Sequence, residues 1–346
     1  MTAPEKDKAE SLMAPAKQTR PLTFRINHER GQAMSENLFK LFVTEFSTLL
    51  RVKLQQTQSK LRGRCMEGGH FGKQASPVQY IGAIQMRSPS GRFAPLDRQD
   101  VDFTRRWVFP QPKEAQQLID RFDKVDLNMD PQAQYVTVAA AAVAREWDDR
   151  LIGAAFSTAQ IGADAGGLSA EVFNTGSTVT SAGFQIVSTF GSSAASGLTV
   201  AKMIEAKRAM RKLQVPVDDE PLTWITNSQG ESDLLNQVQV VSTDFTGADR
   251  PTLVEGKVTR FMGWDIVYSE RLISTSNVRQ NIAWVSSGIY LGIWKDVENN
   301  ITQRFDLSSL PYQIWTGMVS GATRLEQGRL LQVLCADLSS AADVTP

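Results

Sequence analysis

Residues 130–158 read DPQAQYVTVAAAAVAREWDDRLIGAAFST, and this stretch predicts one long helix. Asp130 can cap a helix that begins at Pro131, because the first helical position needs no N–H donor. We expect a helix over about 131–158, roughly 40 Å long at ~1.5 Å per residue. Its apolar residues recur at spacings of three and four, as on one helix face, and they are Val136, Ala140, Val143, Trp147, Leu151 and Ala154.

Charged residues follow one another in the second half of this helix, at Glu146, Asp148, Asp149 and Arg150. Neighbouring carboxylates can form a catalytic or metal site. Here they lie close to basic partners such as Arg145 at helical spacing, which favours a solvated face with salt bridges.

A second amphipathic helix is predicted over 198–214, where the dipeptide Val215-Pro216 ends it. Residues 222–225 (LTWI) then read as a buried strand, and Ser228 can cap a short helix that reaches Val240. The remaining strand candidates are 257–268 with a pivot at Gly263, 282–286, 289–294, and a pair within 312–335 joined near Gly328.

Residues 78–109 predict a long β-hairpin around a turn at 88–91. Apolar and polar residues alternate over 101–109, and each arm of about nine residues would reach ~30 Å. An isolated two-stranded ribbon is marginally stable in water, so this hairpin needs a surface to lie on. That surface is either a neighbouring subunit or the body of its own chain.

The N-terminal segment is basic, although the whole chain has no net charge. Residues 1–75 contain 13 Lys or Arg against 7 Asp or Glu, and the remainder carries the opposite excess. After a polar lead over 1–33, apolar residues recur at helical spacing and predict an amphipathic helix over 36–60. The following basic cluster favours either non-specific contact with nucleic-acid phosphates or a solvated helix face.

The composition of the 346 residues, with 42% hydrophobic and 21% charged side chains, is that of a globular protein of two or three compact units. No apolar stretch approaches the ~20 residues of a membrane span, and no secretory signal is apparent. Two cysteines and two histidines cannot supply a disulfide framework, a zinc site or a histidine-based triad. We therefore predict no catalytic, metal or cofactor site and no enzymatic activity.

The order of these elements resembles the major capsid proteins of tailed bacteriophages, which have the Hong Kong 97 fold. The resemblance covers about 76–337 and lies in the ordered set rather than in any single motif. The stretches that carry it are AREWDDRLIGAA (144–155), LTVAKMIEAKRAMRKL (198–213), LTWITNSQGESDLL (222–235) and VEGKVTRFMGWDIVYSERL (254–272).

The resemblance implies an α+β fold with four parts. These are an N-terminal arm over 1–75, an extended loop over 76–128, a peripheral domain over 129–214 and 301–346 with the long helix as its spine, and an axial α/β domain over 215–300. It also implies pentamers and hexamers that form an icosahedral head around double-stranded DNA. Portal and scaffolding proteins are expected partners, a decoration protein is a further candidate, and the virion assembles in the host cytoplasm.

Two sets of site residues follow from the resemblance. The arm would face packaged DNA or acidic neighbouring subunits, and its candidate cations are Arg51, Lys53, Lys60, Arg62 and Arg64. The hairpin would lie across a neighbour, and its interface candidates are Phe103, Arg105, Trp107 and Phe109, because large aromatic side chains dominate interface energetics. Burial of these aromatic side chains within their own subunit is the alternative.

Three other functions remain open from the sequence. An encapsulin-like bacterial compartment would share the architecture but enclose a cargo enzyme instead of a genome. A cytosolic enzyme with its site in 215–300 would need convergent carboxylates, whereas Asp218, Asp219 and Glu220 look like a loop beside prolines. A basic nucleic-acid-binding module would bind DNA as a monomer or dimer with steep salt dependence.

The extended loop has no lysine between Gln74 and Pro112. Some relatives join their subunits by isopeptide bonds from a lysine of this loop to an asparagine of the adjacent subunit, and this chain lacks that nucleophile. Denaturing electrophoresis of mature particles should therefore give the single subunit band. A ladder of covalently joined subunits would contradict the prediction.

Overall fold

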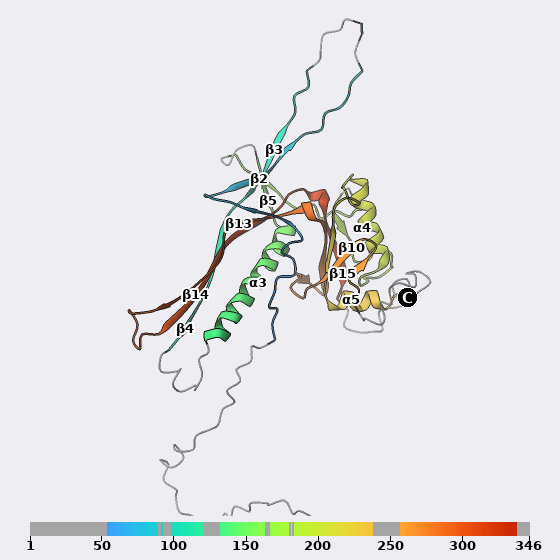
Figure 1. The fold of residues 1–346 in the computed structure, drawn as a ribbon. Coiled ribbons are helices and arrows are strands. Elements are labelled where there is room, and N and C mark those ends of the chain that lie inside the picture. The colour runs from blue at the N-terminus through green and yellow to red at the C-terminus, as the bar shows by residue number, and fades with distance from the viewer. Residues whose placement is uncertain are drawn as a thin grey trace, which may run out of the picture. The chain divides into compact units, whose positions relative to one another are not determined.

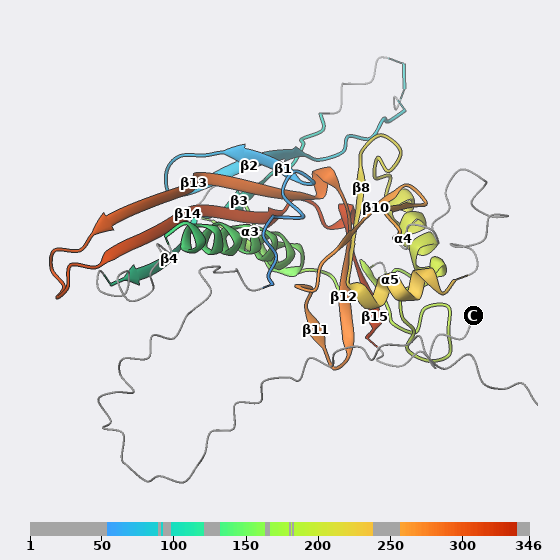
Figure 2. The ribbon, with the colours of Figure 1, turned by 60° about the horizontal axis from the view of Figure 1, so that its bottom comes forward.

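The computed structural model describes residues 54–88, 91–92, 98–120, 132–162, 167–179, 181, 183–237 and 257–337. The strands of these residues form three sheets, and helices pack beside them (Figure 1; Figure 2). This mixture agrees with the predicted α+β class. No helix in the described ranges has the length and apolar content that a membrane crossing requires.

A four-stranded sheet is covered on one face by the long helix α3 (Figure 2). α3 spans Gln132–Phe156, which confirms the helix predicted over 131–158. The strand order is β1-β13-β14-β4, with β1 parallel to β13 and the other pairs antiparallel. The strands span Met66–Gly69 (β1), Ile289–Gln303 (β13), Tyr312–Arg324 (β14) and Gln111–Ile119 (β4).

The second half of α3 provides the buried contact with this sheet. Trp147 and Leu151 are buried and share a hydrophobic core with Met318 of β14. Ala140, a member of the predicted apolar stripe, is exposed instead. The run of alanines over 139–142 puts apolar side chains on every side of the helix, so the sequence does not single out one face there.

A seven-stranded sheet carries the helices α4 (Val200–Lys212) and α5 (Ser228–Leu235). Its order is β7-β15-β12-β8-β10-β9, and β11 pairs with β12 outside this path. The strands span Gln185–Ile186 (β7), Leu330–Ala336 (β15), Val278–Val285 (β12), Leu222–Thr226 (β8), Trp264–Tyr268 (β10), Arg260–Phe261 (β9) and Ser274–Thr275 (β11). The helix over 198–214, the strand at 222–225 and the turn at Gly263 are thus confirmed.

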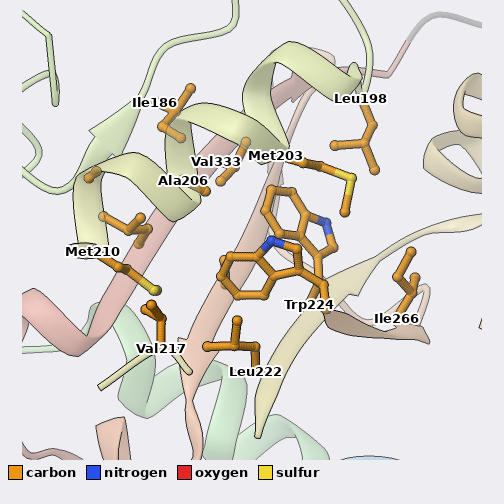
Figure 3. Close-up of a cluster of buried hydrophobic side chains, with 14 of the residues drawn as sticks. Ile186, Leu198, Met203, Ala206, Met210, Val217, Leu222, Trp224, Ile266 and Val333 are labelled. Atoms are coloured by element: carbon orange, nitrogen blue, oxygen red, sulfur yellow. The ribbon is translucent and has the colours of Figure 1, made fainter. Parts of the chain in front are cut away.

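The core of this second part forms between α4 and the sheet. Met203 of α4 points toward the buried indole of Trp224, which packs edge-on against Trp264 with ring centroids 5.3 Å apart (Figure 3). Thr199 caps α4 and Asn227 caps α5, where the sequence suggested Ser228. All five residues of β8 are buried, as expected for a central strand.

The chain passes between the two sheets at two short 3-10 turns, Ser286–Gly288 and Gln327–Arg329. The strands predicted within 312–335 exist as β14 and β15, but they enter different sheets and do not pair with each other. α4 and β15 belong to the core of the seven-stranded sheet, and β13 runs in the four-stranded sheet. The packing therefore does not follow the divisions expected at 214/215 and 300/301.

A third sheet of four strands contains the root of the predicted hairpin, in the order β2-β3-β5-β6. The hairpin arms are β2 (Ala75–Ile81) and β3 (Phe103–Val108), shorter than the nine residues expected. β5 (Ala159–Ile161) and β6 (Ser169–Glu171) extend the sheet on the β3 side. The root is therefore not an isolated ribbon, and the described parts of the loop beyond it lead away from this sheet (Figure 1).

Residues 54–60 are irregular, which corrects the C-terminal part of the helix predicted over 36–60; the part before 54 lies outside the described residues. The backbone N–H groups of Lys60 and Leu61 donate to the carboxylate of Asp148 on α3. These tertiary bonds replace helical ones, so the local apolar spacing does not decide the conformation.

A buried arginine closes the end of α3. Arg324 of β14 donates from Nη1 to the carbonyls of Ala155 and Ser157, both at 2.9 Å, and from Nη2 to that of Glu171 at 3.2 Å. Burial lowers the pKa of Arg324 to about 10, so the side chain still carries its charge at neutral pH. A cation at a helix C-terminus complements the unpaired carbonyls there.

Replacing this arginine should destabilise the subunit strongly. Arg324→Ala removes the side-chain donor of three carbonyls, and the loss at the buried carbonyl of Ala155 alone costs ~1–3 kcal/mol. We expect the free energy of unfolding in urea to fall by about 3 kcal/mol or more. Arg98→Ala, at an exposed side chain, is the control and should leave the midpoint unchanged. Equal midpoints for both variants would contradict this role.

Candidate assembly and nucleic-acid interfaces

The predicted alternation of side chains is present on the hairpin root. Ile81 and Phe103 are direct cross-strand partners, and both are largely exposed, at 67% and 64%. Residues two apart on a strand share a face, so Arg105 and Trp107 lie on the same face as Phe103. Directly opposite pairs also share a face. The outer face thus carries an exposed apolar pair at its end.

The other face of the root packs on the body of the subunit. Val108 is buried with Tyr290 and Leu325, and the buried side chain of Arg106 pairs with the carboxylate of Glu171. Gly321 of β14 permits this close approach. A Cβ at this position would lie 2.3 Å from the carbonyl oxygen of Phe109, the residue that follows β3. The root is therefore held by its own chain, and its outer face is left open.

The four predicted interface residues differ in how much of their surface is free. Phe103 is exposed, whereas Arg105, Trp107 and Phe109 are half-buried. The indole Nε1 of Trp107 donates to the carbonyl of Gly162 at 3.1 Å within the same chain. Trp107 is therefore partly buried in its own subunit, which was the alternative to an interface role. Phe103 is the strongest interface candidate of the four.

The basic candidates of the arm contact acceptors of their own chain. Arg51 and Lys53 lie outside the described residues. Lys60 donates from Nζ to the carbonyl of Tyr268 at 2.7 Å. Arg64 lies 3.7 Å from a carboxylate oxygen of Asp265.

Arg62 is held from three sides. Its Nε lies 3.6 Å from Glu67, its Nη2 lies 3.4 Å from Asp296, and its guanidinium stacks over the ring of Trp147 at 4.7 Å. Carboxylates therefore compensate Arg62 and Arg64 within the subunit. Of the described candidates, Lys60 is the one without a carboxylate partner.

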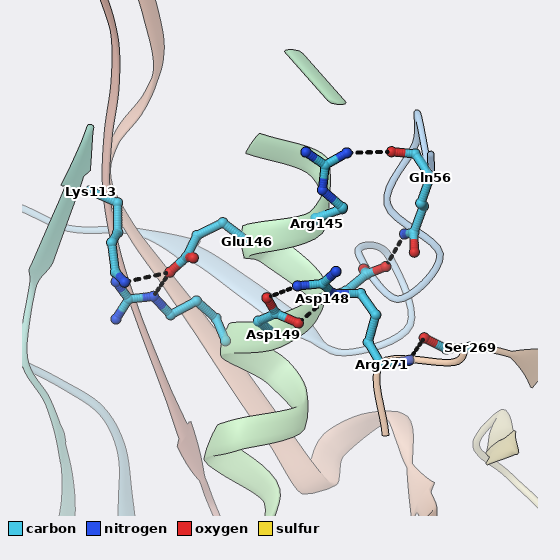
Figure 4. Close-up of polar contacts among 9 residues, drawn as sticks. Gln56, Lys113, Arg145, Glu146, Asp148, Asp149, Ser269 and Arg271 are labelled. Carbon is cyan, nitrogen blue, oxygen red and sulfur yellow. Dashed lines mark hydrogen bonds and ion pairs between the residues drawn. The ribbon is translucent and has the colours of Figure 1, made fainter. Parts of the chain in front are cut away.

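Asp148 is the residue that sequence analysis placed wrongly. It is fully buried rather than part of a solvated face. Its carboxylate accepts a hydrogen bond from Gln56 Nε2 (Figure 4). It also accepts hydrogen bonds from Ser59 Oγ at 2.6 Å and from the backbone N–H of Lys60 and Leu61 at 3.1–3.2 Å. Asp149, the next residue, instead forms a half-exposed ion pair with Arg271.

Residues 55–64, called the root segment below, contact both main sheets. On one side they reach α3 through Asp148 and Trp147. On the other side they reach the seven-stranded sheet, where the indole of Trp284 donates to the carbonyl of Arg64 at 3.1 Å. Leu61 is buried in the core that both sheets share with α3. The root segment therefore joins the two main parts of the subunit.

Neither cysteine offers an activated nucleophile. Burial raises the pKa of Cys65 to about 12 and that of Cys335 to about 11, so both thiols stay protonated at neutral pH. In the parts of the chain that the structure describes, no three His, Cys, Asp or Glu side chains are grouped so that they could hold a metal ion.

Comparison with known proteins identifies the family. The model of the phage capsid protein family matches residues 39–337. Three solved structures have a similar fold. The cyanophage P-SCSP1u capsid has 15% identity and a TM-score of 0.64 over 86% of this chain and 94% of that chain. The cyanophage Pam1 capsid has 10% identity and a TM-score of 0.65, over 87% of this chain and 98% of that chain. The native GTA particle capsid has 12% identity and a TM-score of 0.60, over 88% of this chain and 99% of that chain. No curated protein matches significantly.

The chain belongs to the phage capsid protein family, since the family model covers most of its length. Its fold is the mixed α+β fold of Hong Kong 97-type capsid proteins. The sequence-based prediction of a phage capsid protein, a structural component of the virion and not an enzyme, is thereby confirmed.

Removing the charge of Asp148 should loosen the root segment. In Asp148→Asn one acceptor oxygen becomes an NH₂ donor that faces other donors. We expect the free energy of unfolding in urea to fall by about 2–3 kcal/mol, since buried donors lose their acceptor. Limited proteolysis should also cut faster within 54–61.

Asp149→Asn is the matched control, because it changes the adjacent residue in the same way. Its half-exposed ion pair should contribute less than about 1 kcal/mol. Equal effects of the two substitutions would show that the buried carboxylate has no special role.

Proposed function

We propose that this chain assembles into pentamers and hexamers that form an icosahedral head around double-stranded DNA. The observation that carries the proposal is the open outer face of the hairpin root, where Ile81 and Phe103 stand exposed beside each other. Exposed apolar side chains at the base of a projecting loop favour contact with another surface, and a neighbouring identical subunit provides that surface by symmetry. Family membership supports this proposal.

The packing suggests how the subunit divides into the domains of the resemblance. The arm would cover 1–75 and the extended loop 76–128, as the sequence predicts. The peripheral domain would consist of α3 and the four-stranded sheet, and the axial domain of the seven-stranded sheet with α4 and α5. This division follows the two main sheets rather than the residue numbers 214 and 300.

Besides other copies of this chain, the proposed partners are the ones that the resemblance to tailed-phage capsid proteins implies. Packaged DNA would be bound without sequence preference by cations of the arm and its root, with Arg51, Lys53, Lys60, Arg62 and Arg64 as candidates. The carboxylates beside Arg62 and Arg64 reduce what those two can contribute. Portal and scaffolding proteins would be needed for a head with an entry vertex, and a decoration protein is a further candidate.

Assembly should depend on the outer face of the hairpin. Negative-stain microscopy of the expressed chain should show capsomers or closed shells. Phe103→Asp places a charge where we expect an apolar contact, so it should abolish shells. The subunit's own melting temperature should hardly change, because this side chain is largely exposed.

Thr104→Asp is the control, since it adds the same charge one residue along, on the other face and at an exposed position. It should still assemble. A wild-type chain that stays a compact monomer would contradict the proposed function, and shells formed by Phe103→Asp would contradict the role of this face. Particles that hold protein cargo and no DNA would favour an encapsulin-like compartment.

A further inference from the structure

A polar cavity of about 730 Å³ lies where the root segment passes α3 and the turn at 269–271. Every residue that lines it is polar or charged. Three of them are cations, Lys60, Arg145 and Arg271, and one is a carboxylate, Glu270. The others are glutamine, serine and threonine side chains of residues 55–59, so the wall offers many hydrogen-bond donors and no apolar side chain.

Two of the cations have only neutral partners. Arg145 donates from Nη1 to Gln55 Oε1 at 2.7 Å and to the carbonyl of Gln56 at 3.2 Å. Lys60 donates to the carbonyl of Tyr268. Within the described part of the chain, the other N–H groups of these two side chains have no acceptor. Among the described residues, neither cation therefore has a carboxylate as a hydrogen-bond partner.

The three carboxylates near the cavity accept hydrogen bonds within the subunit, and one of them, Asp149, has a cation as its partner. Glu270 accepts from the backbone N–H of Ser228, the first residue of α5, at 2.7 Å. Asp149 pairs with Arg271, and Asp148 accepts from the root segment (Figure 4). The lining residues themselves comprise three cations and one carboxylate, and Arg271 is the cation with a carboxylate partner beside the cavity.

This chemistry fits a phosphate better than a peptide carboxylate. Phosphate contacts in nucleic-acid complexes come from Arg and Lys together with Ser, Thr and Gln side chains, which are the residue types present here. The core of a protein–protein interface is instead enriched in aromatic and other apolar side chains, and this wall has none. The lining therefore favours a nucleic-acid backbone over an acidic protein segment.

We propose that this cavity binds backbone phosphates of the packaged DNA, with Lys60 and Arg145 as the contacting cations. The proposal rests on the proposed function, since a capsid subunit meets DNA in the filled head. It assigns a DNA contact to Arg145, on the spine helix, which the basic arm alone does not include. A phosphate there would also link the root segment to α3.

Binding of a labelled short DNA duplex to soluble full-length capsomers tests the proposal. Fluorescence anisotropy at several salt concentrations gives both affinity and its salt dependence. The double variant Lys60→Gln with Arg145→Gln should bind about tenfold more weakly at low salt, and its slope of log affinity on log salt should be smaller by about two. The charge-preserving pair Lys60→Arg with Arg145→Lys should bind within about threefold of wild type.

Lys212→Gln is the matched control, because it removes an exposed lysine at the end of α4 that has no ion pair in the described chain. It should change the affinity by less than about twofold. An equal loss in this control, or no loss in the double variant, would overturn the proposal. Displacement of the duplex by poly-glutamate as effectively as by unlabelled DNA of equal charge would also overturn it, in favour of an acidic partner.

Two further readouts separate the outcomes. Circular dichroism shows whether each variant is folded, and if the double variant is not, Lys60→Gln alone decides, with an expected slope change of about one. Microscopy of the same preparations tests assembly independently. If the chain forms shells but the double variant binds the duplex as tightly as wild type, this inference alone is wrong. If the chain forms no capsomers, the proposed function is wrong.

Discussion

A buried carboxylate fixes the place where the N-terminal segment joins the body of the subunit. Burying a charge is costly unless hydrogen bonds replace the lost water, and Asp148 receives such bonds from two side chains and two backbone amides. The four donors lie within six residues of chain, so they define one backbone path between α3 and the seven-stranded sheet. Leu61 follows directly and enters the shared core. A single side chain thereby couples the path of the arm to the spine helix.

Further contacts join the two main sheets of the subunit. The chain passes from β12 to β13 and from β14 to β15 through neighbouring 3-10 turns, where the ion pair of Arg329 and Glu220 adds a contact. Arg324 holds the end of α3 to β14 close to the second crossing. Among the described residues, the outer face of the hairpin root is the part that leaves Ile81 and Phe103 largely exposed side by side.

Periodicity predicted the elements well but not their partners. α3, α4, β8 and the β9–β10 turn follow from local spacing and from breakers such as Pro216 and Gly263. The sequence over 312–335 predicts two strands, and nothing local indicates that they enter different sheets. Asp148 and Asp149 are identical neighbours, so only the tertiary position of the root segment makes one a buried acceptor and the other a partner of Arg271. The hairpin's outward aromatic residue was predictable because alternation fixes faces, whereas the cavity at Arg145 depends on three separated segments.

Hydrogen–deuterium exchange of the soluble wild-type capsomers, at residue resolution, tests the central claim most directly. If Asp148 holds the root segment as described, the amides of Lys60 and Leu61 should be protected to a degree comparable with those of the central strand β12, although they lie in irregular chain. Exchange of these two amides at the rate of an exposed loop, with β12 still protected, would contradict the account.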